Sequence, residues 1–363
     1  MTRTLSFRLS LALLALATLV VVAASANANG SFRARTADDV DTRLAVVAVP
    51  GYHVSLFTSA ADGRKGLAAL SNPDSVAVSG NRVFIDYQNV TSKTGGDGKF
   101  STVVEYNLQG DELHRWNVSG HSDGLRIDPS THLVWTTSNE DGNPTFALID
   151  PKASSVTAYT FPMPTPHGGG YDDLYFLGGK VYVAASNPSN SPNTAPAVDQ
   201  ITLNSNHTIS LTTILMGNAA ATDAISKQPI TLNLQDADSL STDGKGDLVL
   251  ISQADSQIIT IANPGAAGQS VTALSVGTQL EDTVYPRGSG RLLVVDAGGN
   301  TYWISKDTAF TTGSIYTQAP NDSGVTNFVG TVDPATGLIT PFAVGFTKAT
   351  GMVFVPNQSS GDN

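Results

Sequence analysis

The sequence predicts an all-β protein, a six-bladed β-propeller, and three observations support that prediction. A phrase of one carboxylate, one small residue and a short apolar run recurs along the chain at intervals of roughly 50 residues. Gly and Pro number 34 and 18 in 363 residues, which supplies the turns that many short strands need. After residue 30 no long amphipathic helical pattern occurs, whereas β-branched and aromatic residues alternate with polar ones.

The repeated phrase describes the inner hairpin of each blade. It continues from its carboxylate through an apolar run, a turn and a second apolar run. In the fifth copy, the two runs predicted to form the hairpin are residues 283–284 and 291–296. The copies begin at Asp74, Asp123, Asp173, Asp238 and Asp282, with a partial sixth copy at Thr350. The intervals are 49, 50, 65, 44 and 68 residues, which fits blades of about 40–50 residues with two insertions. The alternative architecture, a β-sandwich or barrel, would not repeat a phrase at this interval.

Pairs of alternating apolar runs between the copies predict the outer hairpins. They span residues 103–116, 146–159, 258–274 and 329–342, each interrupted by turn residues. The chain ends one strand into the sixth copy. We therefore expect the N-terminal runs 44–49 and 53–57 to complete the last blade and close the ring.

The first 28 residues have the layout of a secretory signal peptide. Arg3 and Arg8 precede an apolar run over residues 9–24, and Ala-x-Ala sites follow it, which predicts cleavage after Ala26 or Ala28. That run is shorter than the roughly 20 residues of a membrane span. We expect a signal peptide over residues 1–28, a single propeller domain over 29–363, and a secreted or periplasmic protein whose mature chain has no membrane span.

The composition excludes several classes of function. Without cysteine, the chain has no disulfide framework, thiolate metal site or cysteine nucleophile. Loss of the leader removes two arginines and takes the formal net charge from −11 to −13, which argues against nucleic acid and anionic membranes as partners. Because only 14% of the residues are charged, we expect the channel mouth to bind a small neutral molecule or a glycan. We also expect the protein to be a monomer.

The repeated carboxylates are candidate metal ligands. Inner strands line the channel of a propeller, so equivalent positions around one mouth are expected for Asp74, Asp123, Asp173, Asp238 and Asp282. Close carboxylates raise one another's pKa, and Ca²⁺, which takes six to eight oxygen ligands, would relieve the repulsion. In the structural alternative, each aspartate accepts backbone N–H bonds from the neighbouring blade.

In layout, the mature chain resembles the six-bladed calcium lactonases of the gluconolactonase and paraoxonase families, and related exported propellers of unassigned function. The gluconolactonase family carries metal ligands just before inner strands, in the phrases Glu-Gly-Pro, Asn-Gly-Ile and Asp-Gly-Met. Asp74 falls at the place of Glu-Gly-Pro, and Asp123-Gly124-Leu125 matches Asp-Gly-Met. The nearest equivalents of Asn-Gly-Ile are Asp238-Ser239-Leu240 and Thr350-Gly351-Met352. The resemblance implies a calcium-dependent hydrolase of lactones or related esters. The alternative is a non-catalytic secreted binding or interaction propeller.

Two histidines precede inner strands and are candidate catalytic residues, together with Asp123. His121 lies two residues before Asp123, and His167 precedes three glycines and Asp173. A histidine has an unperturbed pKa of about 6.5, so either one could accept a proton from water during hydrolysis. The alternative for each is a loop histidine that is hydrogen-bonded to the backbone.

A serine-hydrolase interpretation of the same segments fails on context. Residues 120–124 fit G-x-S-x-G, and the glycines after His167 resemble an esterase oxyanion loop. The pentapeptide, however, leads into a predicted strand instead of a helix, and the glycines follow the serine instead of preceding it. No βαβ alternation exists to build the required sheet.

Overall fold

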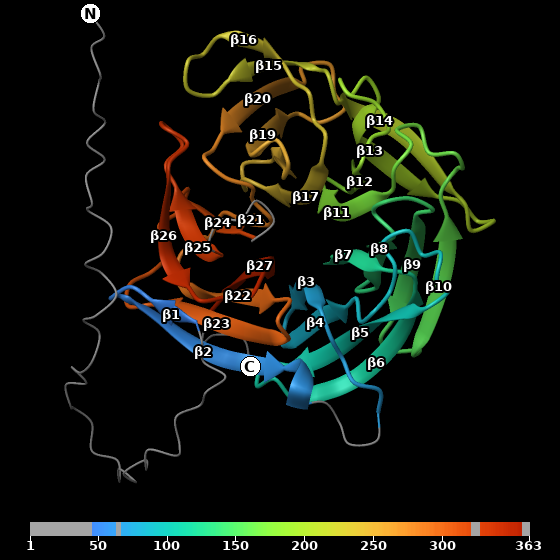
Figure 1. Cartoon of the computed structure of the whole chain (residues 1–363), viewed down its shortest axis with the longest axis vertical. Coiled ribbons are helices and arrows are strands. Elements are labelled where there is room, and N and C mark those ends of the chain that lie inside the picture. Colours follow the sequence, from blue (N-terminus) through green and yellow to red (C-terminus); the bar gives the residue numbers. More distant parts are fainter. Residues whose placement is uncertain (1–45, 63–66, 321–326, 358–363) are drawn as a thin grey trace, which may run out of the picture. The chain divides into compact units, whose positions relative to one another are not determined.

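The computed structural model describes residues 46–62, 67–320 and 327–357. These residues form six antiparallel blades around a central channel, a six-bladed β-propeller (Figure 1). The predicted signal peptide at residues 1–28 lies outside the described residues. Within the described part of the chain, no helix is long and apolar enough to cross a membrane.

Blades 1 to 3 follow chain order, and each has four strands, named in order from the channel outward. Blade 1 comprises β3 (Pro73–Ser79), β4 (Arg82–Tyr87), β5 (Phe100–Asn107) and β6 (Glu112–Ser119). Blade 2 comprises β7 (Ser122–Ile127), β8 (Val134–Ser138), β9 (Thr145–Asp150) and β10 (Ser155–Thr160). Blade 3 comprises β11 (Tyr171–Leu177), β12 (Lys180–Ala185), β13 (Pro196–Leu203) and β14 (Ile209–Met216). The hairpins predicted over 103–116 and 146–159 are confirmed as β5–β6 and β9–β10.

Blade 4 contains one of the two insertions that the repeat spacing predicts. Its propeller strands are β17 (Ala237–Thr242), β18 (Leu248–Ser252), β19 (Gln257–Ala262) and β20 (Ser270–Ser275). The 65-residue interval before it holds a further hairpin of β15 (Ala220–Asp223) and β16 (Pro229–Thr231). Because β15 pairs in parallel with β20, this hairpin extends the outer edge of the blade.

Blades 5 and 6 exchange strands. Blade 5 comprises β21 (Thr283–Val284), β24 (Ile315–Ala319), β25 (Phe328–Val332), β26 (Ile339–Val344) and β1 (Val47–Ala48). Blade 6 comprises β27 (Ala349–Pro356), β22 (Gly290–Asp296), β23 (Asn300–Lys306) and β2 (Tyr52–Ser59), with a 3₁₀ turn at Ala60–Asp62 after β2. The chain thus leaves blade 5 after its first strand, builds the middle of blade 6 and then returns to blade 5.

This exchange corrects the fifth predicted hairpin. β21 pairs with β24 and β22 pairs with β27, so residues 283–284 and 291–296 lie in different blades. β27 has eight residues and pairs along the whole of β22, from Gly290↔Pro356 to Asp296↔Ala349, whereas β21 has only two residues and is too short to do so. The last blade is closed by N- and C-terminal strands, as predicted: β27 is innermost and β2 is outermost. The short run at Val47–Ala48 instead joins blade 5.

The hydrophobic core lies between the blades, with one cluster at each interface of the ring. Successive side chains of a strand point to opposite faces, so each strand packs against both neighbouring blades. In β4, for example, Val83 and Ile85 pack toward blade 6, whereas Phe84 packs toward blade 2. This arrangement buries both faces of the blades, and the acidic side chains gather at the channel.

Candidate functional site

A β-bulge near the start of the inner strand directs polar side chains toward the channel. The ladder between the first two strands shifts register at this point in blades 1, 2, 3, 4 and 6. In a bulge, two residues oppose one residue of the partner strand, and their side chains are re-aimed. The residue two positions before the paired part of each inner strand is Asp74, Asp123, Asp172, Asp238 or, in blade 6, Thr350.

The corresponding residue of blade 5 is Glu281, because the paired part of β21 begins at Thr283. Asp173 and Asp282 therefore stand one residue further along their strands than Asp74 does in blade 1. The sequence-based alignment missed Asp172 and Glu281 because each is followed by a second acidic residue. The signal that could have found them is the spacing from the first apolar residue of each strand.

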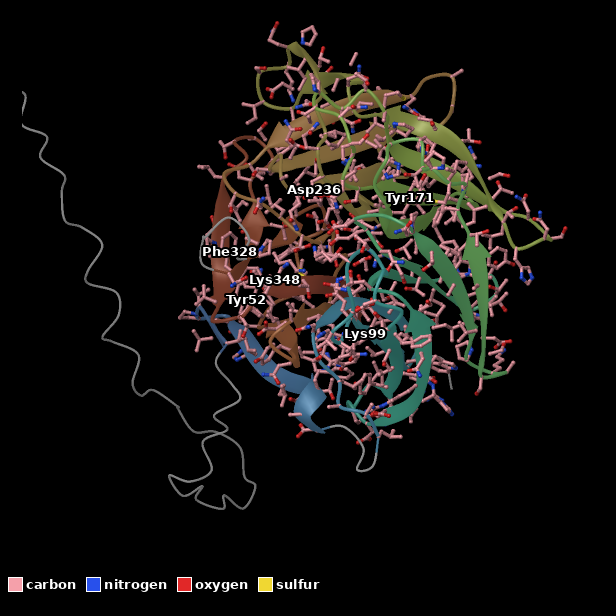
Figure 2. The ribbon with its side chains drawn as sticks, turned by 45° about the vertical axis from the view of Figure 1, so that its right-hand side comes forward. Tyr52, Lys99, Tyr171, Asp236, Phe328 and Lys348 are labelled. Atoms are coloured by element: carbon pink, nitrogen blue, oxygen red, sulfur yellow. The ribbon has the colours of Figure 1, made fainter. Side chains whose placement is uncertain are left out.

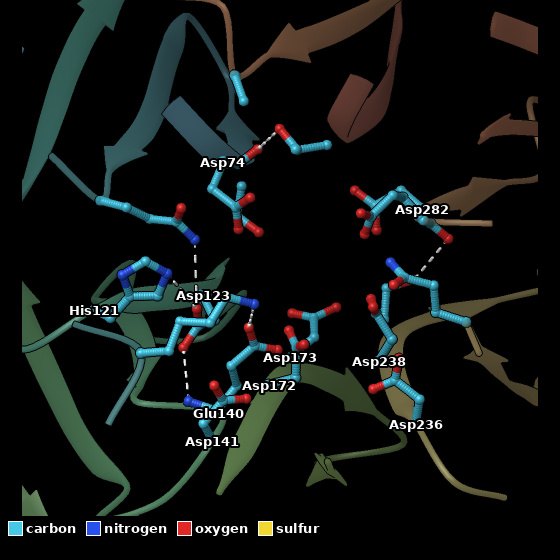
Figure 3. Close-up of a pocket in the computed structure, with 18 of the residues that line it drawn as sticks. Asp74, His121, Asp123, Glu140, Asp141, Asp172, Asp173, Asp236, Asp238 and Asp282 are labelled. Atoms are coloured by element: carbon cyan, nitrogen blue, oxygen red, sulfur yellow. Dashed lines mark hydrogen bonds and ion pairs between the residues drawn. The ribbon is translucent and has the colours of Figure 1, made fainter. Parts of the chain in front are cut away.

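These side chains surround a cavity of about 300 Å³ at one mouth of the channel (Figure 3). All five predicted metal ligands line it, together with His121 and two lysines. Asp236 and Lys348 lie toward the centre of the ring (Figure 2). The ten acidic lining residues are Asp74, Asp123, Glu140, Asp141, Asp172, Asp173, Asp236, Asp238, Glu281 and Asp282.

Burial raises the pKa of most of these carboxyl groups, and neighbouring carboxylates raise it further. The pKa of Asp74 rises to about 7 and that of Asp236 to about 6, in both cases chiefly because burial removes water. For the same reason, the pKa values of Asp123, Asp172 and Asp238 rise well above the usual range. Without a counter-cation, burial therefore favours the protonated form of these carboxyl groups.

His121, Asp123 and Glu140 form a group of potential metal ligands. One ligand atom from each residue lies within 4.8 Å of the others. Nε2 of His121 is 3.7 Å from Oδ1 of Asp123, and the backbone N–H of Glu140 donates to Oδ2 of Asp123 at 3.1 Å. Glu140 was missed from the sequence because it follows β8, outside the repeated phrase.

Two neighbours tune this group. Nδ1 of His121 lies 2.9 Å from the hydroxyl oxygen of Thr91, which leaves Nε2 directed toward Asp123. Burial lowers the pKa of His121, so its imidazole is neutral at pH 7. Burial alone would raise the pKa of Glu140, but the ion pair with the Lys93 ammonium holds that pKa below its usual value.

Arg126 crosses the channel beneath this cavity. Its Nη2 atom donates to Oδ2 of Asp173 and lies 3.7 Å from Oδ1 of Asp282. Each of these aspartates also accepts a backbone N–H bond from the next blade: Leu240 donates to Asp173 at 2.9 Å, and Met352 donates to Asp282 at 2.7 Å. Asp173 and Asp282 therefore fit the structural alternative, in which an aspartate of the ring accepts a backbone N–H bond from the neighbouring blade.

Asp238 differs from that pair. It is 8% exposed, and its carboxylate has no hydrogen-bond partner among the residues that the structure describes. Its neighbours Asp236 and Glu281 raise its pKa in addition to the larger effect of burial. A buried carboxylate without a partner is costly, so this position is suited to a cation.

The structure does not bring His167 to the cavity lining. Its Nε2 lies 2.6 Å from the carbonyl oxygen of Gly170, and its ring contacts Tyr171 edge-on at a centroid distance of 4.9 Å. The glycines after His167 allow close packing: a Cβ at Gly170 would lie 2.1 Å from the carbonyl oxygen of Asn139. His167 is therefore a loop histidine that is hydrogen-bonded to the backbone.

The serine of the G-x-S-x-G match is not exposed for attack. Ser122 is buried, and its hydroxyl donates to Oδ2 of Asp86 at 2.6 Å. Gly124 allows the neighbouring blade to approach, because a Cβ there would lie 2.6 Å from Cα of Asp173. The pentapeptide is therefore a packing feature of the second blade.

The sequence matches no model of a known protein family. No curated protein matches it. Similar solved structures include a protein of unknown function from Bacteroides caccae, which is 11% identical with a TM-score of 0.47 over 81% of this chain and 89% of its own.

Two further similar structures have names that suggest a function. A protein from Bacteroides uniformis, provisionally named a 6-phosphogluconolactonase, is 11% identical with a TM-score of 0.46, over 84% of this chain and 100% of its own. Virginiamycin B lyase from Staphylococcus aureus is 9% identical with a TM-score of 0.45, over 70% of this chain and 99% of its own. Likeness at this level concerns the fold alone, so the chemistry depends on the side chains of this chain.

Proposed function

We propose that the protein is an exported calcium-binding propeller that hydrolyses lactones or related esters in the acidic cavity. The observation that carries the proposal is the crowding of ten carboxylates around one small cavity, with the neutral His121 beside Asp123. Among the described residues, the lining has only two lysines to balance these acids. The leader pattern of residues 1–28 supports export.

The donor set fits Ca²⁺. This ion prefers carboxylate and amide oxygens in a flexible arrangement of six to eight ligands. Asn72, Gln88, Asn187 and Gln253 add amide oxygens to the carboxylates of the lining. The side chains proposed to hold the ion are the acidic residues two positions before the paired part of each inner strand. They are Asp74, Asp123, Asp172, Asp238 and Glu281.

In the proposed reaction, the protein supplies the base and the surroundings. A bound Ca²⁺ would polarise the substrate carbonyl and stabilise the oxyanion that forms. Nδ1 of His121 is bonded to Thr91, and Nε2 has no hydrogen-bond partner in the described part of the chain, so Nε2 is placed to accept a proton from the attacking water. Asp123 then stabilises the imidazolium through its carboxylate, 3.7 Å away, and the imidazolium gives the proton to the leaving oxygen when the acyl–oxygen bond breaks.

The charge of the cavity also favours a particular substrate. The acidic lining repels anions, so a neutral lactone or ester is preferred over a carboxylate. Opening a lactone produces a hydroxy acid that is anionic at neutral pH. The remaining carboxylates would then assist the departure of this product.

A non-catalytic binding propeller is the second candidate, and one observation favours it. The ion pair of Lys93 with Glu140 and the contacts of Arg126 with Asp173 already neutralise part of the acidic cluster. In that case, the cavity would hold a structural cation or a neutral ligand without chemistry.

The deciding experiment is calorimetric titration of chelator-treated protein with Ca²⁺, followed by assays on a panel of γ-lactones, δ-lactones and aryl esters. Asp238→Asn is expected to weaken calcium binding, whereas Asp333→Asn, at an exposed turn after β25, should leave it unchanged. Absence of calcium binding would contradict the metal site. Calcium binding without hydrolysis of any substrate would favour the non-catalytic propeller.

A further inference from the structure

A second cavity, of about 520 Å³, lies further along the channel. Its lining comes from later residues of the inner strands, such as Val76–Val78 of β3 and 352–354 of β27, whereas the acidic cavity uses residues 74 and 350. The two cavities therefore open toward opposite mouths. A volume of this size is typical of pockets that hold small molecules.

Arg126 separates the two cavities. Its side chain lines the second cavity but not the first, whereas Asp282 lines both. The contacts of Arg126 with Asp173 and Asp282 thus form a layer across the channel. Asp282 is the one described residue that lines both cavities, so a ligand in one cavity otherwise contacts different side chains from a ligand in the other.

The second cavity has mainly apolar walls, in contrast to the first. Each of the six inner strands contributes at least one apolar lining residue: Val76, Ile127, Phe176, Leu240, Val284 and Phe354. Asp282 is the one acidic residue in the described lining, and its carboxylate already faces Arg126. An apolar pocket with a few polar groups is the usual form of a small-molecule site.

Positive charge and hydroxyl groups mark one part of this lining. Arg287 is exposed and forms no ion pair with any residue that the structure describes; its Nη2 atom donates to the carbonyl of Gly244. The hydroxyl of Ser241 is buried without a hydrogen-bond partner among the described residues, and the side chains of Tyr175 and Tyr285 also line the cavity. In a chain with a net charge of −11, an arginine left without a carboxylate beside an apolar cavity is suited to a ligand anion.

We propose that the second cavity binds an apolar molecule that carries a single carboxylate, such as a medium-chain fatty acid. The hydrocarbon body lies against the apolar residues of the inner strands, and the carboxylate pairs with Arg287. The planar guanidinium matches a carboxylate in a bidentate geometry. This inference does not depend on calcium or on hydrolysis in the acidic cavity.

The test uses octanoate as the probe in calorimetric titrations of the full-length mature protein, with octan-1-ol and octylammonium as comparators of equal chain length. Octanoate should bind at least about tenfold more tightly than octan-1-ol, because a hydrogen-bonded ion pair contributes roughly that factor. Octylammonium should bind least. Equal affinities for octanoate and octan-1-ol, or no binding of octanoate, would overturn the proposal.

Three variants locate the site. Arg287→Gln should lower octanoate affinity about tenfold while leaving octan-1-ol affinity unchanged. Lys152→Gln, which removes an exposed charge from the β9–β10 turn, is the matched control and should change neither affinity. Val284→Trp should fill the cavity and abolish binding of both probes, with its melting curve as the check on folding.

Asp238→Asn separates this proposal from the function of the acidic cavity. It should leave octanoate affinity unchanged even where it weakens calcium binding, because Asp238 lines only the first cavity. An unchanged preference for octanoate over octan-1-ol in Arg287→Gln would show that Arg287 is not the carboxylate partner.

Discussion

The guanidinium of Arg126 lies 3.7 Å from the carboxylate of Asp282, although the two residues belong to blades 2 and 5, on opposite sides of the ring. The same Nη2 atom donates to Asp173 in blade 3 and to the backbone carbonyl of Leu240 in blade 4. A single side chain thereby connects four blades across the channel. Its charge also allows two aspartates to be buried close together.

Replacement of Arg126 by Met is therefore expected to destabilise the fold by about 3–5 kcal/mol, the usual cost of leaving buried charge without its partner. Urea unfolding measures the loss. Adding Asp173→Asn and Asp282→Asn to that variant should recover much of the stability, because the uncompensated charges are then gone. Arg82→Met, which breaks the more exposed pair of Arg82 with Glu105, is the control and should cost at most about 1 kcal/mol. Equal losses in the two single variants would contradict the prediction.

Calcium affinity should depend on the ring positions that the bulges define. Asp172→Asn and Glu281→Gln are expected to weaken calcium binding at least about tenfold, which corresponds to about 1.4 kcal/mol. Asp173→Asn should instead lower stability with a smaller effect on affinity, because Asp173 is engaged by Arg126 and Leu240. Calorimetry with Ca²⁺ and parallel melting curves distinguish the two effects. An affinity loss in Asp173→Asn as large as that in Asp172→Asn would count against this division.

Saturation with Ca²⁺ should stabilise the protein, by about 2.7 kcal/mol when free Ca²⁺ is one hundred times the Kd. Melting curves with and without chelator measure this shift. Asp238→Asn should reduce it, because its buried carboxylate loses charge, whereas Asp333→Asn at an exposed turn should not. A melting temperature that does not respond to chelator in the wild-type protein would be inconsistent with the proposed site.

Stability of the chelated protein should fall as pH rises from about 4 to 7. Asp74 and Asp173 each have a pKa of about 7 in the folded protein, chiefly because of burial, against an unfolded value of about 3.9. Between these values the folded state holds protons that the unfolded chain has released, so stability falls throughout this interval and levels off once pH has passed through 7. Above pH 6.5 the buried histidines, whose pKa values are lowered, no longer change charge.

Urea unfolding in chelator at several pH values tests this dependence. Saturating Ca²⁺ should remove most of the decline, because a bound cation compensates the carboxylates when they ionise. A free energy of unfolding that stays level or rises across this range in chelator would contradict the prediction.

Hydrolysis should require His121 but not His167. His121→Gln is expected to lower kcat by roughly 10²-fold or more, the typical contribution of a general base. His167→Gln should leave kcat unchanged, because His167 bonds to Gly170 and does not line the cavity. Steady-state assays over a pH series measure kcat for both variants. The pH profile of the wild-type protein should have one limb that follows the deprotonation of His121, and loss of that limb in His121→Gln would identify His121 as the base. Equal effects on kcat would mean that neither histidine is specifically the base.

The blades could be predicted because their signals are local. The alternating runs and turns at residues 258–274 and 329–342 form the hairpins β19–β20 and β25–β26. The exchange between blades 5 and 6 could not be predicted in this way. β22 is apolar on both faces, and its partner on the channel side, β27, comes from the far end of the chain.

The gathering of carboxylates at one mouth of a six-bladed ring could be predicted from the repeat, because the repeat places an acid before almost every inner strand. Which acid of Asp172-Asp173 and of Glu281-Asp282 takes the ring position depends on strand pairing in the folded chain. Side-chain direction follows the pairing register of a strand, and the partner strand sets that register. Arg126 stands at a position of the repeated phrase where the first copy has Ala77, and Glu140 lies outside the phrase. Both reach the channel only through the closed ring, so the division of the channel into an acidic and an apolar compartment was not visible in the sequence.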